Sequence, residues 1–398
     1  MNEMNEMNWI LRLITLSFLL LFMTGCANQK NLSIPADNQS TSTLEYINWQ
    51  SDAYTLIEVP QVKDIFYLNE ASKQHFLTFY NDPQIQTIDG HKRLYNYLEH
   101  FFSGFTYKGD TYNADLASTK HAGNCLSLAI LTKAYASLVG LKVEYRKVNS
   151  EPVYSRENDI MTISSHVQTH VYAPAKLDNR KSTFFFSKVI IDYFPSSRSH
   201  IGGVVENVDF ESMYYHNLAA KALIEENFDY AYSLLAAAMQ LSPNNIETLN
   251  TLAVLYKKSG NHALAESLYK YVLQHSKGSV SVLSNYVILL RDTGRNNEAT
   301  SYENQYMHIK DDNPYRWYDV ANLAYEQKKY TLALRLFQKT TDMAPYLPES
   351  FYGQAKTHFK LGNATKAKSA MRKAAELAYT PKDERRYNSK LQVLNDSF

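Results

Sequence analysis

The sequence predicts a multidomain chain in which an α+β domain is followed by an all-α solenoid of helical repeats. Three observations favour this fold class: a 34-residue pattern recurs through the C-terminal half, a strong helix followed by strand-like segments occupies the middle, and an apolar stretch near the N-terminus stands apart from both. At 398 residues the chain is long enough for two or three domains. We place the segment boundaries at 1–25, 26–45, 46–205, 206–381 and 382–398.

The composition excludes several classes of protein. Lys and Arg number 41 against 40 Asp and Glu, and the net charge of +1 provides no broad field to attract nucleic acid. We therefore expect no nucleic-acid partner. Two cysteines are too few for a disulfide framework, a Cys-rich zinc ribbon or a Cys-ligated iron–sulfur cluster. The histidines His91, His100 and His121 lack metal-ligand spacing, and no phosphate-binding glycine loop occurs, so we expect no metal and no cofactor.

The apolar stretch 13–23 is too short to span a bilayer, and small residues follow it, which favours the signal peptide of an exported protein over residues 1–25. The sequence Met23-Thr24-Gly25-Cys26 resembles the lipobox of bacterial lipoproteins. That resemblance implies that Cys26 is lipidated and anchors the chain in a membrane. Ala27 after the cysteine implies the periplasmic face of an outer membrane. An ordinary soluble secretory signal is the alternative, and Met1, Met4 and Met7 are alternative start sites.

The polar residues 27–44 contain almost no apolar side chains and cannot bury enough surface to fold. Residues 26–45 are therefore expected to be a flexible tether behind the lipidated cysteine.

The next segment, 46–205, is expected to begin with helices and to continue with strands. Residues 52–113 have a mainly helical pattern, with Thr87 as the expected N-cap of a helix over 91–102. A second helix is predicted from Cys125 to about Val139, with Asn124 as its N-cap and Gly140 as its left-handed end. Strand patterns follow at 141–148, 165–173 and 184–194.

Cys125 is a candidate nucleophile because the first turn of a helix favours a thiolate. Such a nucleophile needs a base and a group that orients the base. His166 and His170 compete for the base, and Asp192 is the candidate orienting group. In an antiparallel hairpin, His166 opposite Asp192 gives an index sum of 358, whereas His170 opposite Asp192 gives 362. We favour His166. The alternatives are that Cys125 is a buried small hydrophobe and that the histidine and aspartate are structural.

These residues resemble the Cys, His, Asp triad of the transglutaminase-like superfamily of papain-type cysteine enzymes. The resemblance covers about 88–195 and rests on Gly123-Asn124-Cys125-Leu126-Ser127 and on the strand that begins at His166. It implies that Cys125 is the nucleophile, His166 the general base and acid, and Asp192 the orienting residue. The backbone N–H of Cys125 is the expected oxyanion donor, with Asn124 as a second. Gln168 stands where relatives have an aromatic residue.

The segment 206–381 carries the repeat. Alanines recur every 34 residues from residue 231, and small residues recur with the same period twelve positions earlier. The pattern resembles the tetratricopeptide repeat, which implies five pairs of antiparallel helices stacked in order. Residues 382–394 are expected to form a capping helix within the C-terminal segment 382–398. Such arrays bind peptides or proteins in a groove, although a spacer role is the alternative. The candidate groove residues are Trp317, Tyr318, Asn322 and Tyr352.

Two functions follow from these predictions. The first is a membrane-anchored, transglutaminase-like cysteine enzyme that acts on peptide or glutamine-type amide bonds through a thioester, with hydrolysis favoured over cross-linking. In this hypothesis the repeats recruit the protein substrate. The second is a catalytically inactive envelope adaptor that organises a protein complex through its repeats. The sequence alone favours the enzyme, and the substrate, the partner and the oligomeric state stay open.

Overall fold

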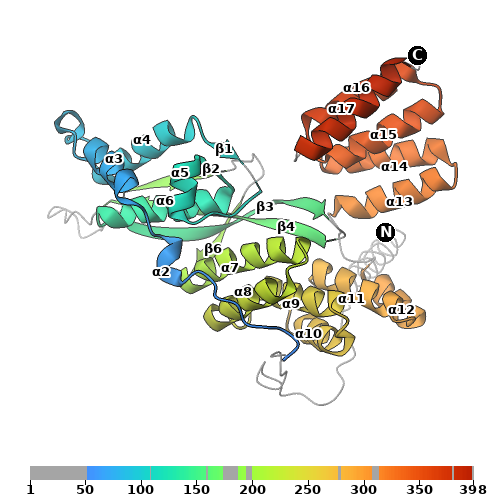
Figure 1. The fold of residues 1–398 in the computed structure, drawn as a ribbon, viewed down its shortest axis with the longest axis horizontal. Coiled ribbons are helices and arrows are strands. Elements are labelled where there is room, and N and C mark those ends of the chain that lie inside the picture. The colour runs from blue at the N-terminus through green and yellow to red at the C-terminus, as the bar shows by residue number, and fades with distance from the viewer. Residues whose placement is uncertain are drawn as a thin grey trace, which may run out of the picture. The chain divides into compact units, whose positions relative to one another are not determined.

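The computed structural model describes residues 52–107, 109–157, 160–173, 187–193, 200–276, 279–306, 313–378 and 381–396. The expected signal peptide, Cys26 and the tether lie outside these residues. The described chain begins with helices, continues into a sheet, and ends in an all-helical region (Figure 1). This order agrees with the α+β region and the helical repeats that the sequence predicts. None of the described helices combines the length and the apolar character needed to cross a membrane.

The first part of the α+β region is helical, as predicted for 52–113. Its helices are α2 (Val62–Ile65), α3 (Glu70–Tyr80), a short 3-10 helix (Pro83–Ile85), α4 (Gly90–Phe102) and α5 (Ala114–Lys120). Asparagine side chains cap two of them, because Asn69 accepts a hydrogen bond from the N–H of Ser72 and Asn113 accepts one from Leu116. The prediction that Thr87 is the N-cap of α4 is wrong. That helix begins at Gly90, and the carbonyl of Asp89 accepts from Lys92 and Arg93.

The helix that carries the cysteine, α6, runs over Cys125–Leu138 and is buried along most of its length. Its start at Asn124 and its end at Gly140, which has φ of +68°, are as predicted. Glycine adopts such a positive φ at a lower energetic cost than residues with a Cβ atom. The short strands β1 (Thr106–Tyr107) and β2 (Ala122–Gly123) pair in parallel, and β2 directly precedes α6.

The main sheet has the order β5-β4-β3-β6, from β3 (Lys142–Glu157), β4 (Ile160–Tyr172), β5 (Lys188–Ile191) and β6 (His200–Val205). All three pairings are antiparallel. The central pair β3–β4 is longer than predicted, and β6 is a strand that the sequence pattern did not indicate. The pairing of β4 with β5 places His170 opposite Ile190, an index sum of 360. The two predicted registers, with sums of 358 and 362, are therefore both wrong, because each is shifted by two residues from the observed one.

Two helices pack against the same face of this sheet. On β3 the ring of Tyr145 stacks on Phe210 with ring centroids 3.6 Å apart. Tyr145 lies opposite Thr169 of β4, and directly opposed residues project from one face. The Tyr193 hydroxyl lies 2.9 Å from Thr169 Oγ1 and 2.8 Å from Thr132 Oγ1 of α6. The first helix of the repeat region and the cysteine helix thus share one core.

The repeat region consists of helix pairs at the predicted spacing. The first helices of the pairs are α7 (Asn207–Ile224), α9 (Ile246–Lys258), α11 (Val280–Asp292), α13 (Pro314–Glu326) and α15 (Pro348–Lys360). The second helices are α8 (Phe228–Leu241), α10 (His262–His275), α12 (Asn296–Tyr306), α14 (Tyr330–Met343) and α16 (Ala364–Glu376). Each first helix ends 34 residues after the one before it. The region is therefore TPR-like, as the sequence predicts.

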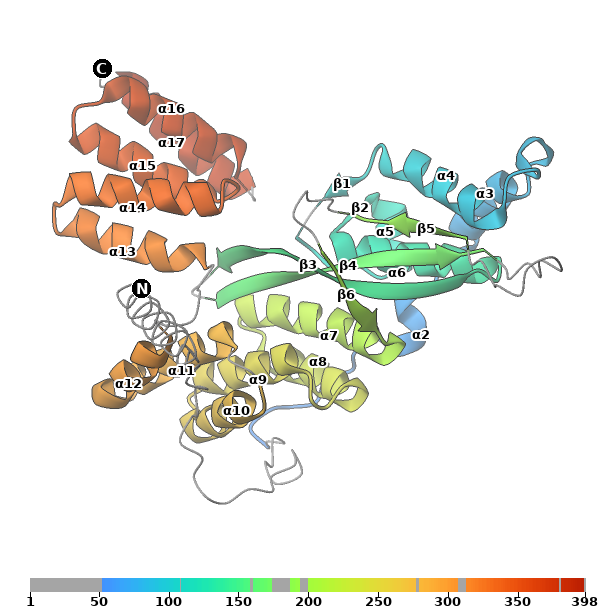
Figure 2. The same ribbon diagram turned by 180° about the vertical axis from the view of Figure 1, so that it is seen from behind.

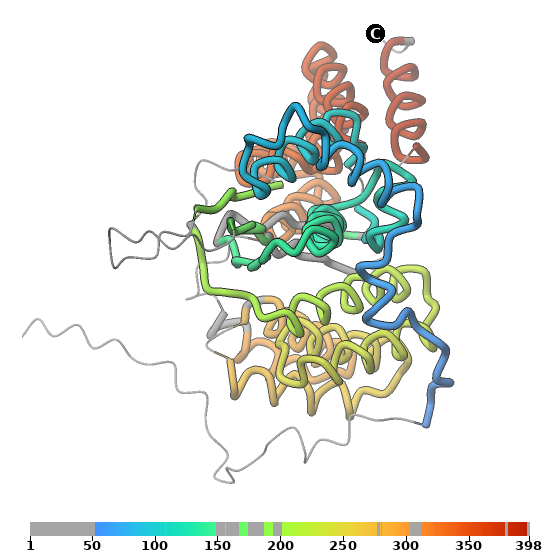
Figure 3. Tube along the Cα trace, turned by 90° about the vertical axis from the view of Figure 1, so that its left-hand side faces the viewer, coloured from blue at the N-terminus to red at the C-terminus, as the bar shows by residue number. Residues whose placement is uncertain are grey.

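A further helix, α17 (Pro381–Asp396), follows the last pair, where a capping helix is expected over 382–394. It buries Tyr387 and Leu394 against α16, and most of its other residues are polar or charged, although Val393 is exposed. At the other end, an extended segment before α2 lies along the first pair (Figure 3). There the N–H of Thr55 donates to Asp229 and that of Ile57 donates to Ser233, at 3.0 and 2.8 Å.

Candidate functional site

The loop before Cys125 is held by a network centred on its neighbours. The Asn124 side chain accepts from the N–H and the hydroxyl of Ser127, both at 3.0 Å. Gly123 has φ of +151°, and a Cβ atom there would lie 2.6 Å from the Cβ of Ser127. No side chain fits at that distance. The motif Gly-Asn-Cys-Leu-Ser thus forms one packed turn that fixes the start of α6.

Asn124 has a structural role in this turn. Its amide nitrogen donates to Thr111 Oγ1 at 2.6 Å and to the carbonyl of Gly109 at 3.3 Å. Both amide hydrogens therefore point into the loop. In this geometry Asn124 offers no hydrogen to an oxyanion, and the backbone N–H of Cys125 is the remaining predicted donor.

The Cys125 thiol is partly buried and free. Burial raises its pKa, and this effect outweighs the hydrogen bonds from the Tyr107 hydroxyl and from the N–H groups of Leu126 and Cys125, which lower it. The negative charge of Asp192 also raises the pKa. The thiolate that the helix start predicts is therefore disfavoured, because the dipole contributes only about 0.3–1 kcal/mol. Tyr107 was missed in the sequence because it precedes the cysteine by 18 residues and carries no motif.

Asp192 directly follows β5, and its side chain contacts Gln168 on the neighbouring strand β4. The Gln168 amide donates to Asp192 Oδ2 at 2.6 Å. The observed register explains this contact, because an index sum of 360 places position 168 opposite position 192. The backbone of His166 pairs with Val148 of β3, and its side chain lies outside the description. Asp192 therefore interacts electrostatically with Cys125 and accepts a hydrogen bond from Gln168. The role of His166 as the base stays a prediction.

The competing base, His170, lies elsewhere on the sheet. Its Nδ1 is 3.0 Å from the Lys188 ammonium, and the side chain is 1% exposed. Burial lowers the pKa of His170, as do the positive charges of Lys188 and Arg146, whereas Glu144 raises it. A buried imidazole that accepts from an ammonium is neutral. The structure thus places His170 beside a cation instead of beside Asp192.

The raised pKa of Cys125 gives a direct prediction. In a Cys26→Ala background Cys125 is the only thiol. Its alkylation by iodoacetamide should be slow at pH 7 and reach half its maximal rate above pH about 8.5, the ordinary value. Tyr107→Phe should move the curve further up, because it removes a bond that favours the thiolate. Tyr67→Phe, on a half-exposed side chain, is the control. A midpoint near pH 7 would contradict this account.

The first helices of the repeats are joined by a ladder of polar contacts. Each contact links a residue to one 34 or 35 positions later, so that successive first helices present the same side next to one another. We call this side the ladder face. The contacts are His216–Thr251 (2.8 Å), Asn250–Asn285 (3.0 Å), Lys257–Asp292 (3.4 Å), Asn322–Lys356 (3.0 Å) and Tyr315–Glu349.

The four predicted groove residues do not share one surface. Tyr318 and Asn322 lie on the ladder face of α13, whereas Trp317 lies on the far side of the helix, since residues advance by about 100° each. The Lys339 ammonium lies 3.2 Å from the Trp317 ring centroid. Tyr352 repeats the place of Tyr318 on α15. Its ring lies 5.6 Å from that of Tyr387, so the capping helix covers it.

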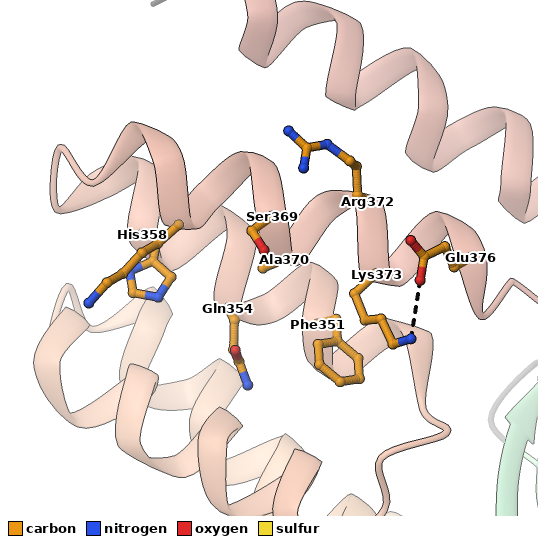
Figure 4. A pocket seen from close by; sticks show the side chains of 9 residues that line it. Phe351, Gln354, His358, Ser369, Ala370, Arg372, Lys373 and Glu376 are labelled. Atoms are coloured by element: carbon orange, nitrogen blue, oxygen red, sulfur yellow. Dashed lines mark hydrogen bonds and ion pairs between the residues drawn. The ribbon is translucent and has the colours of Figure 1, made fainter.

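A pocket of about 480 Å³ opens between α15 and α16 (Figure 4). Phe351 and His358 line it from α15, and Arg372 and Lys373 line it from α16. Lys373 is paired with Glu376 at 3.1 Å. None of the predicted site residues lines this pocket. Within the described residues, no group of three or more His, Cys, Asp or Glu side chains is placed to hold a metal ion.

No protein-family model matches the chain, and no curated protein matches it. Solved structures that resemble it include Pseudomonas aeruginosa pilF (TM-score 0.34, 20% identity, 48% of this chain and 88% of that one). Yeast Tom70 gives a TM-score of 0.38 at 17% identity, over 47% of this chain and 40% of that one. YrrB, described as a TPR protein with an unusual peptide-binding site, gives a TM-score of 0.26 at 14% identity, over 45% of this chain and 92% of that one.

Proposed function

We propose that this chain is a non-catalytic interaction protein whose TPR-like array binds a protein partner. The observation that carries the proposal is the ladder face, on which the first helices align partly exposed polar side chains that a partner can contact, among them Asn250, Asn285 and Asn322. Ile288 on α11, at the place of Asn322 on α13, is 43% exposed. Single exposed apolar side chains are common on protein surfaces, so position 288 serves as a probe placed on the ladder face and not as separate evidence for a contact surface.

The alternative, an enzyme of the transglutaminase-like type, has weaker support. Its nucleophile needs a thiolate, and the pKa of Cys125 is raised. Its aspartate should orient an imidazole, and the side chain of His166, the histidine expected for that role, lies outside the described residues. The features that support the enzyme are the position of Cys125 at the start of α6 and the electrostatic interaction of Asp192 with it.

We also propose that a lipid on Cys26 holds the protein at the periplasmic face of an outer membrane. The support is the apolar stretch and the lipobox-like sequence alone. An adaptor benefits from such an anchor because tethering raises the effective concentration of its partner sites at the membrane.

Photo-crosslinking tests the interaction function. A benzoyl-phenylalanine residue at position 288 of the full chain should give one discrete protein adduct in the cells that make the protein. The same residue at position 335, exposed on α14, should not give it. The adduct should fall at least fivefold in yield when Asn250 and Asn285 are changed to Asp. Equal adducts from both positions, or no adduct at position 288, would contradict the proposal.

A further inference from the structure

One contact joins the long β3–β4 hairpin to the fourth repeat. Near the end of β3, the Arg156 guanidinium donates to both carboxylate oxygens of Asp319 on α13, at 3.0 and 2.9 Å. The same guanidinium lies 4.5 Å from the ring centroid of Tyr315 and 5.4 Å from that of Tyr318. In Figures 1 and 2 the end of the hairpin lies beside α13. We call Tyr315, Tyr318 and Asp319 the arginine seat.

The chemistry of the arginine seat selects a guanidinium. Two parallel N–H···O bonds to one carboxylate match the planar fork of arginine and not the single ammonium of lysine. The tyrosine rings offer faces on which a delocalised cation stacks. Tyr315 itself is buried and hydrogen-bonded to Glu349, so its ring is held in place before any ligand arrives.

The place of Asp319 in the array explains why the seat receives a ligand. Thr251 and Asn285 occupy the same place on α9 and α11, 34 residues apart, and Asp319 follows Asn285 by 34. Thr251 and Asn285 each bind a side chain of the preceding first helix, His216 and Asn250. On α13 the residue at this place, Asp319, instead binds Arg156 of the hairpin. The partner side chain at this place thus comes from the hairpin on α13, whereas on α9 and α11 it comes from the preceding first helix.

The seat is also open to solvent. The side chain of Asp319 is 56% exposed and that of Arg156 is 28% exposed. Bidentate geometry is the arrangement in which a partly exposed ion pair contributes most, but water still reaches the Asp319 carboxylate and competes for it. The contact can therefore open without unfolding either element, and another guanidinium can take the place of Arg156.

We propose that the arginine seat recognises an arginine side chain of the protein partner, and that Arg156 occupies the seat until the partner displaces it. This inference rests on the proposed interaction function and names the chemistry of the partner. An intramolecular ligand acts at a high effective concentration, so it lowers the apparent affinity for the external arginine. Asn322 and Lys356, bonded to each other, continue the same face beside the seat.

Peptide binding to the full chain tests the proposal. The probe is a fluorescein-labelled peptide with the sequence Pro-Val-Tyr-Ser-Arg-Glu-Asn-Asp-Ile, which copies residues 152–160. Measured by fluorescence anisotropy, Arg156→Ala should bind it at least tenfold more tightly than the natural chain. Adding Asp319→Asn to Arg156→Ala should weaken binding at least tenfold. Probes with lysine or citrulline in place of arginine should bind at least tenfold more weakly.

Matched variants act as controls. Arg335→Ala removes an exposed arginine of α14, and Glu326→Gln neutralises an exposed carboxylate of α13. Neither should change binding more than twofold. Arg156→Lys keeps the charge without the fork, so it should release the seat about as fully as Arg156→Ala. Far-UV circular dichroism of every variant checks that the helices are retained.

Two results would overturn the proposal: no gain in affinity from Arg156→Ala in a folded chain, or equal binding of the arginine and citrulline probes. Either could occur while the adduct at position 288 persists, in which case the interaction function stands and the arginine seat does not. The reverse outcome, peptide binding without any adduct, would retain the seat and contradict the contact surface at Ile288.

Discussion

Replacing Phe210 with alanine is expected to lower the free energy of unfolding by about 3–5 kcal/mol, the range for a buried Phe changed to Ala. Phe210 is fully buried, and its ring stacks on Tyr145 with centroids 3.6 Å apart and planes 5° from parallel. The substitution removes the side chain that joins β3 to α7. Since the sheet and the first repeat share this core, both should unfold at a lower concentration of urea.

Phe359→Ala is the matched control, because this side chain is 39% exposed on α15. It should change the free energy of unfolding by less than about 1 kcal/mol. The measurement is urea denaturation followed by circular dichroism in both variants. A change below about 1 kcal/mol for Phe210→Ala would show that the sheet and the first repeat are not one folding unit.

The repeat spacing could be predicted from the sequence because it is encoded locally. Ala219, Ala253, Ala321 and Ala355 are each fully buried, and each lies where its helix packs closely against a neighbour. A larger side chain at any of these places would separate the helices. The requirement recurs every 34 residues and is visible without knowledge of the remainder of the chain.

The register of the sheet could not be predicted in the same way. Index sums of 358, 360 and 362 all keep the same side chains on the same face, because a strand repeats every two residues. The apolar pattern therefore cannot choose among them. The contact between Gln168 and Asp192 depends on this choice, as does the location of His170 beside Lys188.

Contacts between distant parts of the chain were also beyond prediction. Arg156 and Asp319 are 163 residues apart, and no local pattern relates them. For Cys125 the sequence correctly indicated the start of a helix, whose dipole favours a thiolate. It did not reveal that the thiol is partly buried, and burial is the larger effect on its pKa.

The central claim is that the protein acts by binding and not by covalent catalysis. Under this claim Cys125→Ala should leave function intact, because a small apolar side chain replaces a partly buried neutral thiol. Ile288→Asp should abolish function, because it places a charge within the contact surface of the ladder face. Ile288 is exposed, so this change should leave the fold intact.

Complementation of a strain that lacks the gene tests this claim most directly, with the two variants produced at equal protein levels. We predict full rescue by Cys125→Ala and less than a tenth of the natural activity with Ile288→Asp. Loss of function with Cys125→Ala, together with rescue by Ile288→Asp, would contradict the claim and assign the protein to the cysteine enzymes.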